Sequence, residues 1–378
     1  MRVIVAPDSF KGSLSSPKAA KAIAQGLFKV WPEAEIILFP LADGGEGTVE
    51  ALVHLGGGRL VEDLVQDPLG RTVKAVRGLL DNGKTAVVET SAASGLTLLA
   101  SGELNAVVTT SYGLGQQIRN AIKGGAERLI VGLGGSATND AGAGMLSALG
   151  ARLIGKSGRE LHPGGLALLE LEEIDDSNLL KAFREIPILV ASDVQNPLVG
   201  QHGASHVYGP QKGAGAEEVE RLDEALSRFA SVAREITGRD VASLPGAGAA
   251  GGLGAAFMAF TEAKFRPGVE LILEEGGFKR KAAGASLVVT GEGRTDAQTS
   301  CGKAPAGVAA LASQMGVPTV CLSGSLGDGY EKLYQIMAGV MSASPGPATL
   351  SEAMAKAEPW LAAAAERLAR LLDLRLKA

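Results

Sequence analysis

The chain has 378 residues, of which 46% are hydrophobic, 20% charged and only 4% aromatic, and its net charge is −5. This length exceeds what one ordinary hydrophobic core supports, so we expect two domains. Nucleic-acid binding needs a concentrated basic patch, and the only short basic run, at residues 278–284, is typical of a solvated helix end. The 52 glycines cluster in short loops without a collagen-like period, which suits an α/β enzyme.

The sequence predicts a protein of the cytoplasm. Cys301 and Cys321 are too few for a disulfide framework, which fits a reducing compartment. The N-terminus lacks a basic region followed by an apolar signal core, and no apolar run approaches the ~20 residues that span a bilayer. We therefore expect neither membrane nor nucleic-acid partners, while the oligomeric state is left open.

The predicted elements repeat one order, namely an apolar strand, a polar or glycine-rich loop, and a helix. Ser16 and Pro17 form a helix start before residues 18–30, because serine suits the N-cap and proline the first helical position. Further helices are expected from about Thr48, at 143–150, 216–238 and 304–316, and from about Ser351. The strands are expected at 2–7, 35–41, 128–134, 186–191, 286–290 and 317–324.

Continuous Val, Ile and Leu runs indicate strands that are buried on both faces of a helix-covered parallel sheet. We predict a discontinuous first α/β domain of residues 1–75 and 286–378, with residues 76–285 inserted as a second α/β domain. Ligands of such sheets bind at the carboxyl ends of the strands, where the polar loops of this chain lie.

Two nucleotide-binding motifs are disfavoured. Residues 132–137, GLGGSA, have dinucleotide-fingerprint spacing, but Gly155 and Lys156 stand where NAD binding requires an acidic residue. An anion site at 133–138, formed by N–H groups at a helix N-terminus, stays open. The Gly-Lys pair at 302–303 lacks the neighbours of a Walker A motif.

Zinc chemistry is also disfavoured. The chain has four histidines, and His202 and His206, although spaced by four, fall in a predicted loop, so a structural role is the better interpretation. Acid–base chemistry would then depend on carboxylates, lysines and hydroxyls.

Carboxylates concentrate directly after the predicted strands. These are Asp8, Asp43, Glu46, Asp193 and Asp296, and the cations near them are Lys11, Lys212, Arg294 and Lys303. A lone aspartate before a helix is more often a turn or cap residue. Together, however, these groups predict a polar cleft that suits Mg²⁺ and an anionic substrate, and therefore phosphoryl transfer.

Five motifs carry a resemblance to a known family: VAPDSFKGSLSSPKAA, PLADGGEGT, GLGGSATNDAGAGM, SDVQNPLVGQHGAS with GPQKGA, and TGEGRTDAQTSCGKAP. In this order, and over essentially the whole chain, they resemble the bacterial two-domain glycerate kinases. The resemblance implies an ATP-dependent, Mg²⁺-requiring kinase that converts D-glycerate to 2-phosphoglycerate. It also implies a flavodoxin-like doubly wound parallel sheet, a second α/β domain, and an active site in the cleft between the two.

The resemblance suggests residue roles as hypotheses. Lys11 with Ser9 would hold the transferred phosphate or the glycerate carboxylate, in a loop shared with Asp8. Asp193 or Asp296 would be the base or a metal ligand, and we favour Asp193 near the substrate hydroxyl. The remaining candidates for substrate or phosphate binding are Gly134, Gly135, Ser136, Asn139, Lys212, Arg294 and Lys303.

For Asp43 and Glu46, a magnesium-binding and a structural role are equally supported. The adenine pocket leaves no trace in the sequence. Two alternatives of other classes are an NAD-dependent oxidoreductase acting on a small hydroxy acid and a non-catalytic protein that binds small anions.

Overall fold

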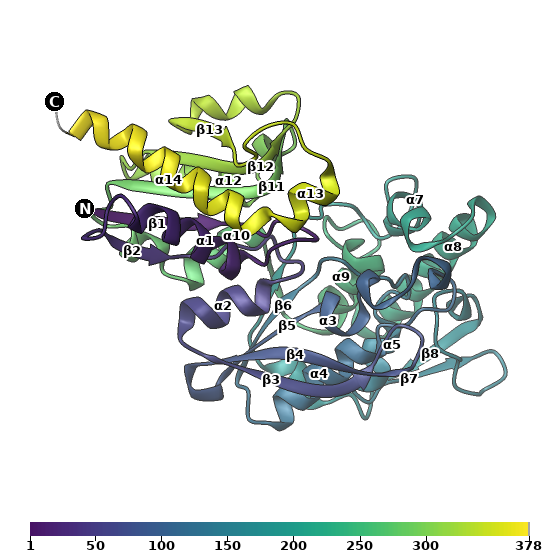
Figure 1. Cartoon of the computed structure of the whole chain (residues 1–378). Coiled ribbons are helices and arrows are strands. Elements are labelled where there is room, and N and C mark those ends of the chain that lie inside the picture. The colour runs from purple at the N-terminus through teal and green to yellow at the C-terminus, as the bar shows by residue number, and fades with distance from the viewer. Residues whose placement is uncertain (377–378) are drawn as a thin grey trace. The chain divides into compact units, whose positions relative to one another are not determined.

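The computed structural model describes residues 1–376, and its contacts divide the chain into two compact units. The first unit comprises Met1–Asp43, Glu50–Gly56 and the residues from Gly268 onward, so it unites the N-terminal and C-terminal elements of Figure 1. The second unit comprises Gly44–Val49 and Gly57–Pro267. No helix among residues 1–376 has the length and apolar character needed to cross a membrane.

The first unit is built on a five-stranded parallel sheet in the order β13-β12-β11-β1-β2. Its strands are β1 (Arg2–Pro7), β2 (Glu35–Leu38), β11 (Leu287–Thr295), β12 (Thr319–Leu326) and β13 (Gly339–Ser342). Numbered along the chain, this order reads 2-1-3-4-5, which is the flavodoxin-like arrangement. The predicted fold class is therefore confirmed. The strand order reverses between β1 and β11, and folds of this kind bind ligands at such a reversal.

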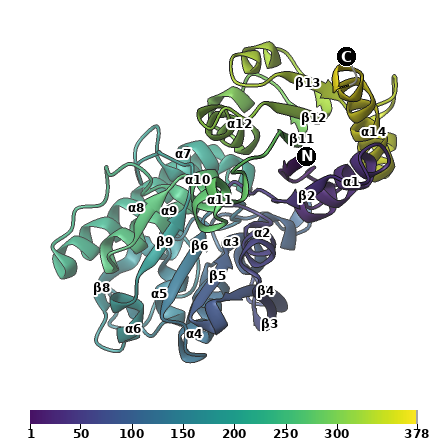
Figure 2. The same cartoon turned by 90° about the vertical axis from the view of Figure 1, so that its left-hand side faces the viewer.

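Helices cover both faces of this sheet. Figure 2 shows α12 (Ala304–Gln314) on one side, and α1 (Ser16–Phe28) with α14 (Ala357–Leu376) on the other. The core follows the alternation of β12, because Val320 and Leu322 pack with α1 and α14 while Cys321 packs with α12. The remaining α-helices of this unit are α2 (Thr48–Gly56), of which Glu50–Gly56 belong here, α10 (Gly268–Glu275), α11 (Phe278–Lys281) and α13 (Leu350–Ala355). The helix predicted from about Thr48 is therefore confirmed.

The start of α1 lies one residue earlier than predicted. Ser15, rather than Ser16, is the N-cap, and its side chain makes no capping hydrogen bond. Pro17 is consequently the second helical residue, where its missing N–H is still tolerated.

The second unit contains a six-stranded mixed sheet in the order β10-β9-β6-β5-β4-β3. The strands β5 (Thr85–Glu89), β6 (Arg128–Gly132), β9 (Ile188–Ala191) and β10 (Lys264–Arg266) are parallel. The antiparallel hairpin of β3 (Arg59–Gln66) and β4 (Thr72–Leu80) extends the edge at β5. A separate two-stranded ribbon pairs β7 (Arg152–Gly155) with β8 (Leu171–Asp175).

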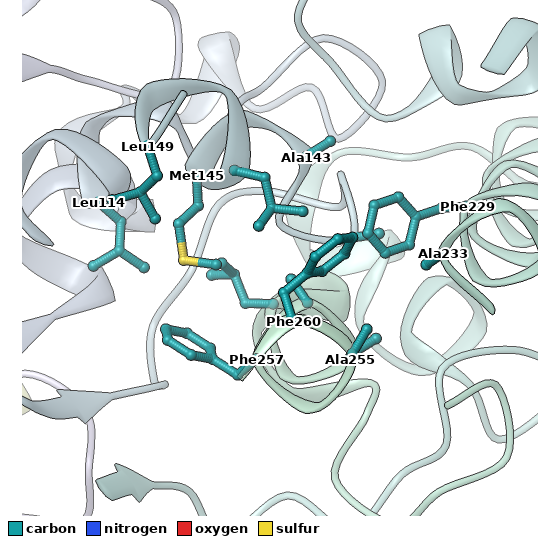
Figure 3. Close-up of a cluster of buried hydrophobic side chains, with 14 of the residues drawn as sticks. Leu114, Ala143, Met145, Leu149, Phe229, Ala233, Ala255, Phe257 and Phe260 are labelled. Carbon is teal, nitrogen blue, oxygen red and sulfur yellow. The ribbon is translucent and has the colours of Figure 1, made fainter. Parts of the chain in front are cut away.

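The core of the second unit is formed where its helices meet. Figure 3 shows side chains of α5 (Ala143–Ala148), α8 (Ala216–Thr237) and α9 (Ala249–Phe260) gathered in one cluster, and its members Met145, Phe229 and Phe257 are buried. The remaining helices are α3 (Thr90–Ser94), α4 (Tyr112–Lys123), α6 (Lys181–Glu185) and α7 (Ala204–Tyr208).

The unit limits fall at other residues than the predicted domain boundaries at 75 and 285. The hairpin of β3 and β4 pairs with β5, so residues 57–75 belong to the second unit. Residues 268–285 belong to the first unit, where Phe278 packs edge-on against Phe39 with the ring centroids 5.1 Å apart. The two units are defined by their internal contacts, and independent folding of each as a domain is a different property. The discontinuous two-domain organisation therefore stays a proposal.

Candidate functional site

A cavity of about 670 Å³ lies in the first unit at the carboxyl ends of its strands. Acidic and basic side chains from three loops line it together. They are Asp8 and Lys11 after β1, Asp43 after β2, and Glu292, Arg294, Asp296 and Lys303 from β11 and the segment that follows it. The cavity therefore occupies the point where the strand order reverses, as expected for the ligand site of this fold.

Asp8 is the buried acid of the cavity. The Ser9 backbone N–H donates to Asp8 Oδ1 at 2.7 Å, which fixes the carboxyl group at the end of β1. Burial, together with the negative charge of Asp43, raises the pKa of Asp8 to about 7. The carboxyl group thus lies where a bound cation would stabilise its charged form.

Lys11 is the exposed cation of the cavity. Its Nζ lies 3.5 Å from Asp43 Oδ2, and 79% of its side chain is accessible. The Asp43 carboxylate raises the pKa of Lys11, so the ammonium group stays charged at neutral pH. An accessible ammonium group can reach a phosphate or carboxylate that enters the cavity.

The end of β11 supplies a second acid held by hydroxyl groups. Glu292 Oε1 accepts hydrogen bonds from Thr295 Oγ1 at 3.0 Å and from Thr299 Oγ1 at 2.6 Å. Burial raises the pKa of Glu292. The sequence prediction missed this residue, although it lies just after the strand predicted at 286–290. The acidic residue inside the GEGRTD motif was the available signal.

Asp296, Arg294 and Lys303 form the outer charged group. Arg294 Nε lies 3.4 Å from Asp296 Oδ2, and Asp296 Oδ1 accepts the Gln298 N–H at 2.9 Å. Lys303, the N-cap residue of α12, donates from Nζ to Gln298 Oε1 at 3.2 Å. Two further cations thus share the cavity with Lys11.

The glycine motifs of the second unit serve close backbone packing. A Cβ atom on Gly134 would lie 2.5 Å from Gly45 Cα, and one on Gly132 would lie 2.5 Å from the Gly44 carbonyl oxygen. These glycines allow the loop at 44–47 to lie against the end of β6. The prediction that residues 133–138 form a helix N-terminus is wrong, because α5 begins only at Ala143.

Three predicted phosphate-binding side chains in the second unit bind protein groups instead of facing an open surface. Lys212 is only 2% exposed, and its Nζ donates to Ser136 Oγ at 2.9 Å and to the Thr138 carbonyl oxygen at 2.7 Å. Burial lowers the pKa of Lys212 to about 7. Asn139 is also buried, and its Nδ2 donates to Ser205 Oγ at 2.9 Å. These contacts hold the loop that follows β6.

Two buried acids that the sequence prediction did not single out hold the backbone at the carboxyl ends of β5 and β6 by hydrogen bonds. Asp140 accepts hydrogen bonds from the Ser111 N–H and Oγ at 2.8 and 2.9 Å, and also from two backbone N–H groups at 142 and 144. Glu89, the last residue of β5, accepts the Val49 N–H at 3.0 Å. Burial raises the pKa of both carboxyl groups. The signal for Asp140 was its place in the longest glycine motif.

Gly135, Glu46 and Asp193 are the exposed predicted residues of the second unit, and Gly134 is half-buried. Asp193 directly follows β9, as predicted from the strand-end pattern. Neither Glu46 nor Asp193 lines the 670 Å³ cavity. The structure therefore places Asp8, Ser9, Lys11, Asp43, Arg294, Asp296 and Lys303 around one cavity, and Ser136, Asn139 and Lys212 in another cluster.

The predicted loop around His202 and His206 is wrong for His206. Residues 204–206 are not a loop but begin α7. His206 Nε2 lies 3.2 Å from Glu220 Oε1 of α8, and a structural role for this histidine stays a prediction. In the part of the chain that the structure describes, no three His, Cys, Asp or Glu side chains form a metal-binding group.

Comparison with known proteins decides the family. The model of the Glycerate kinase family matches residues 3–373. The chain belongs to the glycerate kinase family. The recognition of this family from the five motifs is therefore confirmed.

The family relatives match over nearly their whole length. A glycerate kinase of Halalkalibacterium halodurans is 46% identical over 368 residues, covering 97% of each chain. A glycerate 2-kinase of Escherichia coli K12 is 42% identical over 378 residues, covering 100% of this chain and 99% of the relative. A solved structure from Salmonella typhimurium LT2, assigned as glycerate kinase 2, superposes with a TM-score of 0.90 at 44% identity and covers all of both chains.

Proposed function

We propose that this member of the glycerate kinase family transfers the γ-phosphate of ATP to the 2-hydroxyl of D-glycerate, releasing 2-phosphoglycerate and ADP. The observation that carries the proposal is the whole-length family match, together with a cavity at the switch point that contains acids and cations. Phosphoryl transfer depends mainly on positioning and charge neutralisation, which such a cavity supplies. The family match favours this activity over a hydride transfer or simple anion binding.

The three cations of the cavity would neutralise the phosphate groups. Lys11 is accessible, and its pairing with Asp43 orients the ammonium group without burying it. Arg294 and Lys303 supply further N–H donors from β11 and the N-cap of α12. Charge-assisted hydrogen bonds of this kind are roughly twice as strong as neutral ones. Ser9 would add its hydroxyl group beside Lys11.

The acids of the same cavity suit Mg²⁺. Burial and, after it, the negative charge of Asp43 raise the pKa of Asp8, and a bound cation would stabilise the charged form of this carboxyl group. Mg²⁺ typically uses one or two carboxylates plus phosphate oxygens, so a cluster of three protein ligands is unnecessary. When bound, the ion neutralises charge on the transferring phosphate. We assign Asp43 and Asp8 as its ligands, while Glu46, which does not line the cavity, stays a prediction.

The base that receives the proton of the substrate hydroxyl is one of two aspartates. Asp193 is exposed at the end of β9, and we retain it as the first candidate. Asp296 is paired with Arg294 and hydrogen-bonded to Gln298, which favours a role in holding substrate charge. The turn of half-buried Gly134 and exposed Gly135 is the remaining candidate for phosphate contacts from backbone N–H groups in the second unit.

A coupled assay of ADP release tests the function. The purified protein, ATP, Mg²⁺ and D-glycerate should release ADP, with L-glycerate and lactate as matched acceptors that lack the correct configuration or the second hydroxyl. Chelation of the metal should stop the reaction. Equal ADP release with and without D-glycerate would contradict the proposed function.

A further inference from the structure

The cavity of the first unit has an apolar half that the phosphoryl-transfer chemistry does not use. Its wall consists of Phe10, Leu350, Met354 and Trp360, which we call the apolar wall. Phe10 comes from the loop after β1, and the other three come from α13 and α14. A three-carbon acid has no apolar group that would cover such a surface, so the wall indicates a second kind of ligand group.

The apolar wall is held against the loop that carries Lys11. A Cβ atom on Gly12 would lie only 2.7 Å from Met354 Cε, so the methionine packs directly on the backbone next to Lys11. Leu350 nevertheless remains 76% exposed and Met354 remains 37% exposed. Phe10 is only 3% exposed, so the accessible part of the wall consists mainly of Leu350 and Met354. Such positioned but accessible side chains can cover a flat ligand.

We propose that the apolar wall binds the purine ring of ATP, with its phosphates directed toward Lys11, Arg294 and Lys303. This inference rests on the proposed function, because it assigns the nucleobase part of the same site. The argument is complementarity, since a nucleotide combines a flat apolar ring with an anionic tail, and the cavity combines an apolar half with three cations. The cavity volume of about 670 Å³ lies within the ordinary range for sites of molecules of this size.

The side-chain types of the apolar wall also indicate how the purine ring is bound. Methionine and tryptophan side chains contact the face of an aromatic ring through dispersion and sulfur–aromatic contacts. The four side chains of the wall carry no charge and no amide group, and the indole N–H is the one hydrogen-bond donor among them. The base would thus be bound mainly by its faces.

The first test separates contacts to the base from contacts to the phosphates. The double variant L350S/M354S should weaken ATP binding about tenfold in calorimetry, because it removes two apolar contacts. Binding of tripolyphosphate, which has the anionic tail without the base, should not change. The matched control is L374S, since Leu374 is 70% exposed on α14 and does not line the cavity.

The second test uses the two tryptophans of the chain. Trp360 lines the cavity, whereas Trp31 is buried at the end of α1 and its indole nitrogen donates to Asp373 at 3.4 Å. ATP should change the intrinsic fluorescence of the wild type and of W31F but not of W360F. Tripolyphosphate should produce no comparable change.

The outcomes distinguish this inference from the proposed function. An unchanged ATP affinity in L350S/M354S, or an equal loss for ATP and tripolyphosphate, overturns the nucleobase assignment even when the wild type phosphorylates D-glycerate. A wild type that forms no phosphoglycerate overturns the proposed function, whatever the binding data show. Selective loss of ATP binding, together with a signal from Trp360, supports the assignment.

Discussion

The two sheets of this protein end in loops of similar composition, yet their charged residues are used differently. In the first unit, Lys11 and Arg294 expose 79% and 68% of their side chains at a cavity. In the second unit, Lys212 and Asp140 are 2% and 1% exposed, and both are hydrogen-bonded to the loop around them. Charged residues after a strand can therefore serve either a ligand or the protein framework, and for Lys11 and Lys212 burial distinguishes the two.

The largest expected effect tests the framework role of Asp140. The variant Asp140→Ala should lose about 3–5 kcal/mol of unfolding free energy, because backbone and hydroxyl donors are left buried without their acceptor. Asp296→Ala, at the open cavity, should lose about 1 kcal/mol or less. Urea denaturation measures both. Similar losses of unfolding free energy in the two variants would contradict a framework role that is specific to Asp140.

The next effect concerns the ligand role of Lys11. The variant Lys11→Met should lower kcat/KM about 10²–10³-fold, since one charge-stabilising contact is lost in the transition state. Its melting temperature should stay close to that of the wild type because the side chain is exposed. An unchanged kcat/KM would remove Lys11 from the mechanism.

The two candidate bases can be separated by amide substitution. Asp193→Asn should lower kcat at least about a hundredfold if Asp193 accepts the proton, as general bases commonly contribute. Asp296→Asn should mainly raise KM for D-glycerate, because its partner Arg294 is then less well oriented. Steady-state kinetics at saturating ATP measure both variants, and near-normal turnover of Asp193→Asn would reject the first assignment.

An effect that is smaller per pH unit is the pH dependence of stability that Lys212 introduces. Its pKa falls from 10.5 to about 7 on burial, so the unfolded chain binds the extra proton between these values. Stability should therefore rise with pH across this window, with a slope of about 1.4 kcal/mol per pH unit at most from this group. The free-energy cost of burying the charged Lys212 ammonium group is fully present below pH 7.

Lys212→Met removes this titrating group and serves as the control. The difference in unfolding free energy between wild type and variant should change in favour of the wild type as the pH rises from 7 to 10. Parallel pH profiles would show that the Lys212 ammonium group stays charged in the folded protein.

The smallest expected effect is discrimination between purine nucleotides. Because the apolar wall contacts the base mainly by its faces, GTP should support phosphorylation with kcat/KM less than about tenfold below that of ATP. A much stronger preference for ATP would indicate hydrogen-bond readout of the base edge from groups outside the wall.

The sequence predicted β1, β2, β6, β9, β11 and β12, because each is a short apolar run that ends at glycine or hydroxyl residues. It did not predict β3, β4, β5, β7, β8, β10 or β13. It also located Asp8, Lys11 and Asp43, which share a strand edge with Asp296. It ended one strand at residue 290, whereas β11 continues to Thr295, and it missed Glu292 within this extension. It could not separate Lys212 from Lys11, since burial depends on contacts far apart in the sequence.

The apolar wall was invisible in the sequence for a related reason. Leu350, Met354 and Trp360 have the spacing of an ordinary amphipathic helix at the end of the chain. Only the packing of Met354 against Gly12, more than three hundred residues earlier, assigns this helix to the cavity.

The most direct test of the central claim is ³¹P NMR of the reaction products. Wild-type protein with ATP, Mg²⁺ and D-glycerate should produce ADP and 2-phosphoglycerate in equal amounts, and Lys11→Met should produce them far more slowly. Accumulation of ADP with inorganic phosphate alone, or an equal rate in the variant, would contradict the account.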